Sequence, residues 1–392
     1  MMLSHDSRDD FPFFSNEDVI YLDNAATSQK PQSVLDTMNA YYTHYCSNTH
    51  RGSHDLGNKA TQEYENARHN IASFIGAEAK ELIFTRGTTE ALNLVASSFV
   101  AHNYKNVLLS HLEHHSNILP WQLQGLSIKV IPMDENLNID IQGFRTLLEE
   151  NPKSFVSLTH ISNSFGIINP IKELTALAHE FDCVVMIDGA QALAHENIDV
   201  KDLDVDFYAV SSHKAYGPTG IGALYGRYEL LSQMAPYQGG GSMIKDVTFA
   251  KSTFLDPPLR FEAGTQAIAE AIGFSAAIDY LRSLEDINEH DSLLMNYAKS
   301  ELEKIRGLVL YTHAPNVSGN ISFTIEGIHH DDISILLSKQ KVMLRSGHHC
   351  ALPIMRHLGI EGTVRLSFAI YTTKDDIDRT IVALNKAIKM LS

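Results

Sequence analysis

The sequence predicts an α/β protein: a large domain on a mostly parallel sheet, followed by a smaller C-terminal α+β domain. Short apolar segments typical of buried strands alternate with segments of helical spacing between residues 81 and 214. This alternation is typical of βαβ units, which build parallel sheets. The 392 residues are 44% hydrophobic and 20% charged, as in ordinary globular proteins. We therefore expect one sheet-based domain and a second, smaller unit after it.

Six segments are expected to be strands of the large domain and four to be its helices. The expected strands are Glu81–Thr85, Val107–Leu109, Ile128–Pro132, Phe155–Thr159, Cys183–Ile187 and Phe207–Val210. The expected helices are Ser33–Tyr42, 88–100, Ile139–Glu149 and Ile171–Phe181.

The second unit is expected to follow a long connecting helix. We predict an N-terminal segment over 1–20, a large domain over 21–266, the connecting helix over 267–284 and a small domain over 285–392 that packs with the N-terminal segment. Strands are expected at 308–311, 320–325 and 364–368, and helices at 293–305 and 377–391. The last helix carries apolar residues at steps of four and three, the spacing of a packed face.

Charge and composition exclude several classes of partner. The formal net charge is −16 and no long basic run occurs, which argues against nucleic acid and anionic membranes. No apolar run reaches membrane-spanning length, and residues 1–14 lack the pattern of a secretory signal. Three widely separated cysteines suggest no disulfide framework and favour a reducing compartment. We expect a cytoplasmic protein.

Polar side chains follow five of the expected strands at their carboxyl ends, where ligands bind to open α/β sheets. These groups are Thr88-Thr89, His114, Asn163, Asp188 to Gln191, and Ser211 to Lys214. Each alone has an ordinary explanation: the threonines could cap a helix, and Lys214 could be a solvated loop residue. Their recurrence on successive strands predicts a ligand site instead.

The chemistry of these groups suits pyridoxal 5′-phosphate. Lys214 can form a Schiff base with its carbonyl, which requires a desolvated amine. Asp188 can hold the pyridine nitrogen protonated, and His114 can stack on the ring. Gln191 can reach the phenolic oxygen. The phosphate donors would be Thr89, with Thr88 beside it, together with Ser211 and His213.

Two residues of the second unit also fit an active site. Arg365 stands in an apolar strand, where a buried guanidinium needs a partner such as a substrate carboxylate. Cys350 follows a glycine and two histidines in a loop, and nearby positive charge would favour its thiolate. A lone cysteine is more often a small buried hydrophobic residue.

A metal site is the alternative from another class of protein. A metal-dependent hydrolase would use His111, Glu113, His114 and the pair His348-His349. The order of the first three differs from that of helical zinc motifs, and they follow a strand, so we predict no metal.

Several motifs together resemble the cysteine desulfurases of the class V aminotransferase family, in the SufS-like (group II) branch. They are Leu22 to Thr27, Arg86 to Glu90, Glu113 to Asn117, Asp188 to Gln191, Ser211 to Lys214, Phe261 to Thr265 and Arg345 to Cys350. The resemblance runs from about Tyr21 onward over nearly the whole sequence. It implies the fold of type I pyridoxal-phosphate enzymes, with Lys214 as the Schiff-base lysine.

The resemblance also implies further site residues and partners. Thr265 would reach the cofactor phosphate of a partner subunit, so a homodimer is expected. Asn163 would contact cofactor or substrate, Arg345 and Arg365 would bind the substrate, and Cys350 would receive sulfur. Arg51 and Glu90 match residues that the branch uses near the dimer interface. A small sulfur-acceptor protein of the SufE or SufU kind is implied as well.

The implied reaction converts L-cysteine to L-alanine and leaves a persulfide on Cys350, which feeds iron–sulfur cluster assembly. Catalysis would rest on Lys214, Cys350 and His114. Within the fold, a selenocysteine lyase acting on L-selenocysteine or a cysteine sulfinate desulfinase is the alternative. A third class is a cofactor-free sulfur-binding or scaffold protein.

Overall fold

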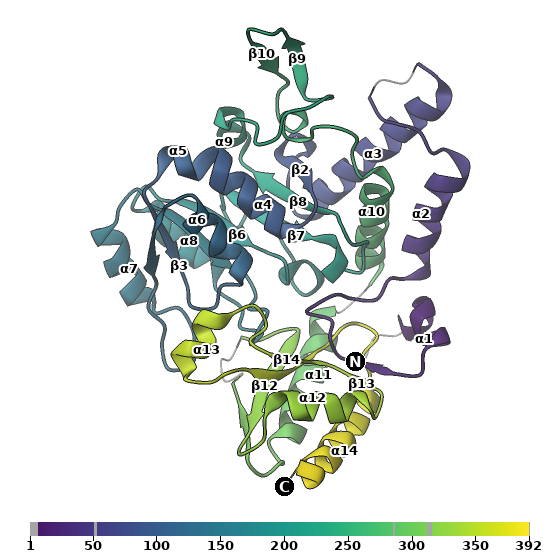
Figure 1. The fold of residues 1–392 in the computed structure, drawn as a ribbon, viewed down its shortest axis with the longest axis vertical. Coiled ribbons are helices and arrows are strands. Elements are labelled where there is room, and N and C mark those ends of the chain that lie inside the picture. Colours follow the sequence, from purple (N-terminus) through teal and green to yellow (C-terminus); the bar gives the residue numbers. More distant parts are fainter. Residues whose placement is uncertain (1–6, 51–52, 285–286, 312–315, 392) are drawn as a thin grey trace.

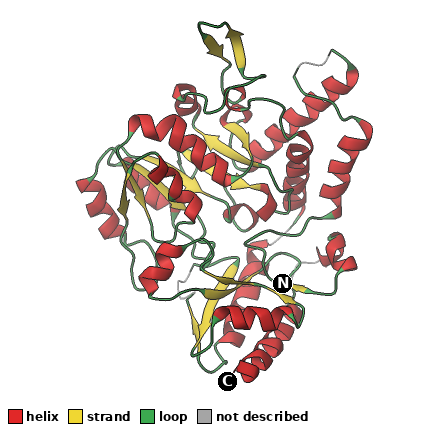
Figure 2. Cartoon of the chain, in the orientation of Figure 1, coloured by secondary structure: helices red, strands yellow, loops and turns green. Residues whose placement is uncertain are grey.

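The computed structural model describes residues 7–50, 53–284, 287–311 and 316–391. The chain forms a large sheet-and-helix part and a smaller part beneath it. The hairpin of β9 (Ile244–Val247) and β10 (Ser252–Phe254) projects from the opposite end (Figure 1). Helices lie on both sides of the large sheet (Figure 2). The predicted α/β class, with a mostly parallel sheet in the large part and a smaller α+β unit, is therefore confirmed.

The large sheet has seven strands in the order β2-β8-β7-β6-β5-β3-β4. Their bounds are Leu82–Thr85 (β2), Gly222–Gly226 (β8), Phe207–Ser211 (β7), Val184–Asp188 (β6), Phe155–Thr159 (β5), Asn106–Leu109 (β3) and Ser127–Val130 (β4). Only β8 runs antiparallel to its neighbours, β2 and β7. The other pairs are parallel, so the carboxyl ends of β2, β7, β6, β5 and β3 share one edge.

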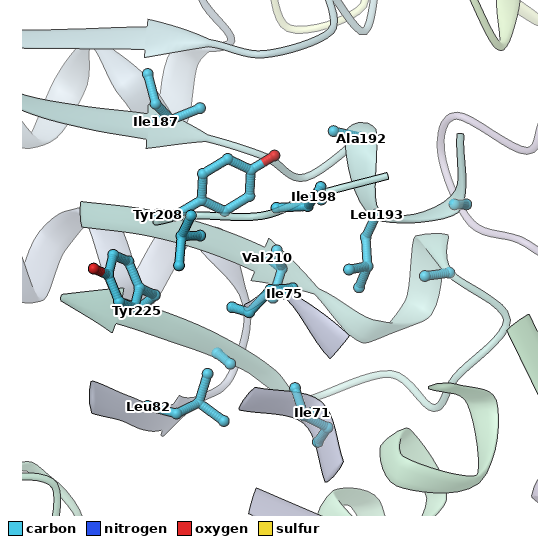
Figure 3. Packing of buried hydrophobic residues seen from close by; sticks show 14 of the residues in the cluster. Ile71, Ile75, Leu82, Ile187, Ala192, Leu193, Ile198, Tyr208, Val210 and Tyr225 are labelled. Carbon is cyan, nitrogen blue, oxygen red and sulfur yellow. The ribbon is translucent and has the colours of Figure 1, made fainter. Parts of the chain in front are cut away.

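Both faces of this sheet are buried except at its edge strand β4. Successive residues of β7 point to opposite faces, so Tyr208 and Val210 pack with one cluster and Phe207 and Ala209 with the other. The first cluster lies against α3, α7, α8 and α10, and Figure 3 shows part of it around Tyr208. The second lies against α4 and α6. Strands buried on both faces read as continuous apolar runs, which is why the sequence revealed them.

The helices of the large part cover the two faces of its sheet and flank its ends. In chain order they are α1 (Pro12–Asn16), α2 (Gln32–His44), α3 (Asp55–Phe74), α4 (Thr88–Val95), α5 (Ala101–Asn103), α6 (Leu119–Leu123), α7 (Ile141–Glu150), α8 (Ile171–His179), α9 (Tyr228–Gln233) and α10 (Ile268–Ser283). The helix expected over 88–100 continues from α4 as a π-helical turn, Ala96–Val100.

The smaller part has a four-stranded antiparallel sheet, β11-β12-β15-β14. Its strands are Leu308–Leu310 (β11), Asn320–Ile325 (β12), Thr363–Ser367 (β15) and Arg345–Gly347 (β14). Its helices are α11 (Ile287–Leu302), α12 (His330–Ser338), α13 (Leu352–Leu358) and α14 (Lys374–Leu391). The sheet encloses a hydrophobic cluster with α11, α12 and α14, whereas α13 packs in a separate cluster with residues of the large part.

The N-terminal segment joins the two parts. β1 (Ile20–Tyr21) pairs in parallel with β13 (Val342–Met343), and Ile20 belongs to the core of the smaller part. Phe11 is fully buried and meets the rings of Tyr216 and Tyr371 at 5.8 and 4.6 Å. The predicted division of the chain at residues 20, 266 and 284 stays a prediction.

Several elements were not predicted, among them α3 and the β9–β10 hairpin. α3 buries mostly small residues such as Ala60 and Ala67, so few large apolar side chains mark it in the sequence. The hairpin of β9 (Ile244–Val247) and β10 (Ser252–Phe254) is mostly exposed and has no apolar face against the core. Within the described ranges, no helix combines the length and the apolar character needed to cross a membrane.

Candidate active site

A cavity of about 290 Å³ lies where the shared strand edge meets the smaller part. Twelve of the predicted site residues line it: Thr88, Thr89, His114, Asn163, Asp188, Gln191, Ser211, His213, Lys214, Arg345, Cys350 and Arg365. Thr265 does not; it lines another cavity of about 410 Å³ with Arg86 and Glu90. Arg51 lies outside the described residues.

Lys214 ends a 3-10 turn, Ser212–Lys214, directly after β7. The strand therefore delivers its side chain to the edge of the sheet. Burial lowers the pKa of Lys214 from 10.5 to about 8, although the nearby Asp188 carboxylate opposes this change. The amine is thus close to its neutral, nucleophilic form near physiological pH, as a Schiff-base lysine requires.

Asp188 is the last residue of β6, the strand next to β7. It is 5% exposed, and its Oδ1 accepts a hydrogen bond from the Ala190 N–H at 3.0 Å. Burial raises the pKa of Asp188, whereas this hydrogen bond and the charge of Lys214 lower it. Gly189 packs so closely on Tyr208 that an added Cβ would lie 2.1 Å from its ring.

Gln191 follows Asp188 in the loop after β6 and is buried at the cavity wall. Its Nε2 donates to the Ala25 carbonyl at 2.8 Å. This bond fixes the amide and leaves its second N–H available to a ligand.

His114 stands beyond the end of β3 in a neutral form. Its Nδ1 accepts the Ser116 N–H at 3.1 Å, so the ring proton lies on Nε2. Burial, reinforced by the charge of Lys214, lowers the pKa of His114 to about 3. The neutral ring is suited to stacking on an aromatic ligand and can donate a proton from Nε2.

Hydroxyl groups gather at the start of α4. The residue before the helix is Gly87, at φ 142°, so Thr88 and Thr89 lie in the first turn and do not cap it. Ser211 Oγ lies 2.9 Å from both the backbone N and the Oγ1 of Thr88. Thr89 Oγ1 lies 2.8 Å from Ser116 Oγ. Hydroxyls and a helix N-terminus form a suitable phosphate site.

His213 lines the same cavity as the hydroxyl side chains at the start of α4. Burial lowers its pKa to about 4, with help from the charges of Lys214 and Lys30. The lysine, carboxylate, neutral imidazole and phosphate donors together match the chemistry of pyridoxal 5′-phosphate, and the residues present fit this cofactor.

The two arginines share the carboxylate of Asp23, whose part in the site was not predicted although it lies in the motif Leu22 to Thr27. Asp23 Oδ1 lies 3.2 Å from Arg365 NH2, and Asp23 Oδ2 lies 3.0 Å from Arg345 NH2. Burial lowers the pKa of Arg365 to about 10, which still leaves it charged at neutral pH. Two guanidinium groups against one carboxylate leave a surplus positive charge in the cavity, suited to a substrate carboxylate.

Asn163 lines the cavity and also holds the loop that carries Cys350. Its Nδ2 donates to the His349 carbonyl at 2.7 Å, and its own carbonyl accepts from Arg365 at 2.7 Å. It therefore ties β5 to the turn that carries Cys350. Cys350 itself lies in the turn between β14 and α13, where it is exposed and lines the cavity.

The residues of the metal alternative do not converge. The ring of His111 lies 4.6 Å from that of His357, and both oxygens of Glu113 accept hydrogen bonds from its neighbours. Within the described residues, the one close group of three metal-ligating side chains is His329, His330 and Asp331, outside that alternative. The side chains named for the hydrolase alternative therefore form no close group of three metal ligands in the described part of the chain.

Comparison with known proteins defines the class. Residues 20–380 match the family described as Aminotransferase class-V, so the chain belongs to this family, whose cofactor is pyridoxal 5′-phosphate. The resemblance predicted from the motifs is therefore confirmed at the level of the family.

Within the family, the chain is similar to cysteine desulfurases over its full length. It is 42% identical to a probable cysteine desulfurase of Vibrio cholerae over 406 residues, covering 100% of both chains. The apo cysteine desulfurase of Thermococcus onnurineus NA1 superposes with a TM-score of 0.94 at 36% identity, covering 100% of this chain and 99% of that one. The Escherichia coli cysteine desulfurase CsdA, in an S-sulfonic acid form, gives 0.90 at 36% identity over 98% of each chain.

Proposed function

We propose that this chain is a pyridoxal-phosphate-dependent cysteine desulfurase that converts L-cysteine to L-alanine and takes the sulfur onto Cys350. One observation carries the proposal: Lys214 and Cys350 line the same cavity of about 290 Å³, although they come from different parts of the fold. The first would activate the carbon skeleton and the second would receive the sulfur.

The cofactor, when bound, supplies a carbonyl for the substrate amine and an electron-withdrawing ring. Lys214 would hold it and, once released, would move the α-proton of the substrate, because its lowered pKa lets it act as a base near neutrality. Asp188 would keep the ring nitrogen protonated. His114 would stack on the ring and donate its Nε2 proton. Thr88, Thr89, Ser211 and His213 would bind the phosphate, and Gln191 the phenolic oxygen.

The sulfur step balances without an external oxidant. The Cys350 thiolate attacks the substrate sulfur; an S–S bond forms, and the Cβ–S bond breaks with its electron pair left on the carbon skeleton. The skeleton takes up a proton and leaves as alanine. A thiol and L-cysteine thus become a persulfide and L-alanine.

The arginine pair would orient the substrate for this attack. Arg365 and Arg345 carry the surplus positive charge described above, and Cys350 lines the same wall. Binding the substrate carboxylate there would direct its side chain toward the thiol. Asn163 would support this arrangement through its bond to His349.

Features of the smaller part support the SufS-like branch. Only residues 348–351 separate β14 from α13, which makes the turn around Cys350 short. We propose that a small acceptor protein of the SufE or SufU kind removes the persulfide sulfur for iron–sulfur cluster assembly, and that the enzyme acts in the cytoplasm.

A homodimer belongs to the same proposal. Thr265 lies outside the cavity of its own chain, which is expected if it serves the phosphate of a partner subunit. Sedimentation should then give twice the monomer mass. A monomer with full activity would contradict this part of the proposal.

The test compares two exposed cysteines in the holoenzyme. Cys350→Ser should lose both alanine release from L-cysteine and the gain of one sulfur atom by the protein, read by mass spectrometry. Cys46→Ser, at an exposed cysteine outside the cavity, should retain both. Full alanine release by Cys350→Ser would refute the mechanism. Activity on L-selenocysteine or cysteine sulfinate alone would indicate the lyase or the desulfinase instead.

A further inference from the structure

The turn that carries Cys350 has a backbone conformation that needs outside support. His349 and Cys350 both adopt positive φ, 50° and 55°, in the left-handed region that residues other than glycine rarely occupy. Such conformations persist when neighbouring contacts over-determine them. The contacts that hold this turn therefore decide where the Cys350 thiol lies.

His115 makes two hydrogen bonds to the turn, one on each side of Ala351. Its backbone N–H donates to the Cys350 carbonyl at 2.8 Å. Its ring Nε2 accepts the N–H of Leu352, the first residue of α13, at 3.1 Å. A single residue of the large part thus holds the cysteine through its backbone and the start of the next helix, α13, through its ring.

The second contact specifies the state of the His115 ring. Because Nε2 accepts a hydrogen bond, the ring must be neutral, with its proton on Nδ1. Burial, together with the neighbouring His348 ring 5.7 Å away, lowers the pKa of His115 and so favours this neutral form. A side chain that places a hydrogen-bond acceptor at the position of Nε2 could therefore make the same bond to Leu352.

We propose that His115 is a positioning residue that holds the Cys350 turn in its strained conformation, through the acceptor at Nε2, so that the thiol faces the cavity. This role rests on the proposed function of Cys350 as the sulfur acceptor. It differs from the role of the adjacent His114, which would face the cofactor.

The test measures amide hydrogen exchange of residues 349–352 in the holoenzyme. His115→Phe keeps a ring and the backbone N–H but removes the acceptor, so exchange should rise about fivefold, the effect of losing one neutral hydrogen bond. His115→Gln places Oε1 near the former Nε2 and should restore the exchange of the unmodified protein. His111→Phe is the matched control, because the His111 ring packs on His357 and makes no hydrogen bond to the turn in the described structure.

Sulfur transfer to Cys350 should fall by a similar factor in His115→Phe and recover in His115→Gln. Unchanged exchange in His115→Phe, or the same increase in His115→Gln, would overturn the proposal. If His115→Phe does not fold, the nitrogen-15 signals of His115, identified by their loss in His115→Gln, decide the matter. A proton on Nδ1 supports the role and a proton on Nε2 refutes it.

These outcomes are separate from those of the proposed function. Exchange does not require turnover, so it tests the turn even in an enzyme that releases no alanine from L-cysteine. Conversely, if hydrogen exchange does not change in the His115 variants, the His115 proposal fails, but the loss of activity in Cys350→Ser would still support the proposed function.

Discussion

Replacing Lys214 with methionine should stabilise the cofactor-free protein while abolishing cofactor attachment. Each pH unit by which burial lowers a pKa corresponds to about 1.4 kcal/mol. A fall from 10.5 to about 8 means that the protonated Lys214 costs the folded apoprotein about 3 kcal/mol. Methionine fills a similar volume without the charge, so Lys214→Met should recover about this amount at pH 7.

The sign of the pH dependence makes this prediction specific. Between pH 8 and pH 10.5 the unfolded chain binds more protons at Lys214 than the folded protein does, so stability rises with pH across that window. The advantage of Lys214→Met should therefore shrink from about 3 kcal/mol at pH 7 to near zero above pH 10.5. Urea unfolding of both apoproteins at several pH values measures it, with Lys386→Met on an exposed helix face as the control. Equal stability of the two apoproteins at pH 7 would refute the reasoning.

Three further predictions concern charges in other places. Arg365→Lys should lower kcat/KM for L-cysteine by roughly tenfold to a hundredfold, because lysine binds the substrate carboxylate more weakly. Steady-state alanine release measures this, and an unchanged kcat/KM would contradict the prediction. Glu262→Gln removes the buried one of the two carboxylates that contact Arg68, at 2.6 Å, and leaves only the more exposed Glu65 at 2.9 Å. Urea unfolding should therefore show a loss of about 1.5–3 kcal/mol, the contribution of a charged hydrogen bond; a loss under 1 kcal/mol would contradict this. Burial lowers the pKa of His195, but the Asp291 carboxylate outweighs it and the net pKa is raised; the pair therefore stabilises the protein below pH 6.5 and less as pH rises through the folded-state pKa. His195→Asn should destabilise more at pH 6 than at pH 9, and an equal loss at both would argue against the pair.

Strand ends could be read from the sequence because parallel strands buried on both faces leave continuous apolar runs, and polar residues mark where each run stops. Lys214, Asp188 and His114 were found in this way. β8 was not, although Gly222–Gly226 is as long as β7, because it begins and ends with glycine and follows the turn around Gly217-Pro218 and Gly220.

Contacts between distant segments could not be predicted in the same way. Asp23 meets Arg365 across 342 positions, and nothing local in the sequence at residue 23 indicates a carboxylate shared by two arginines. His115 likewise belongs to a histidine-rich motif in the sequence. Its hydrogen bond to Leu352, 237 positions away, depends on how the two parts of the fold meet. Periodicity and spacing report the neighbourhood of a residue in the chain, whereas these roles are set by tertiary packing.

The pairing of β1 with β13, and of Asp23 with the two arginines, has a consequence for synthesis. Residues 20–23 leave the ribosome long before residues 342–365, so their partners do not yet exist when they emerge. The lysine of the large part can be complete while the carboxylate pocket and the thiol turn are still missing. If Arg365 and Cys350 act as proposed, a nascent chain that already holds cofactor lacks both the site for the substrate carboxylate and the acceptor of its sulfur. Desulfuration would then require translation past residue 365.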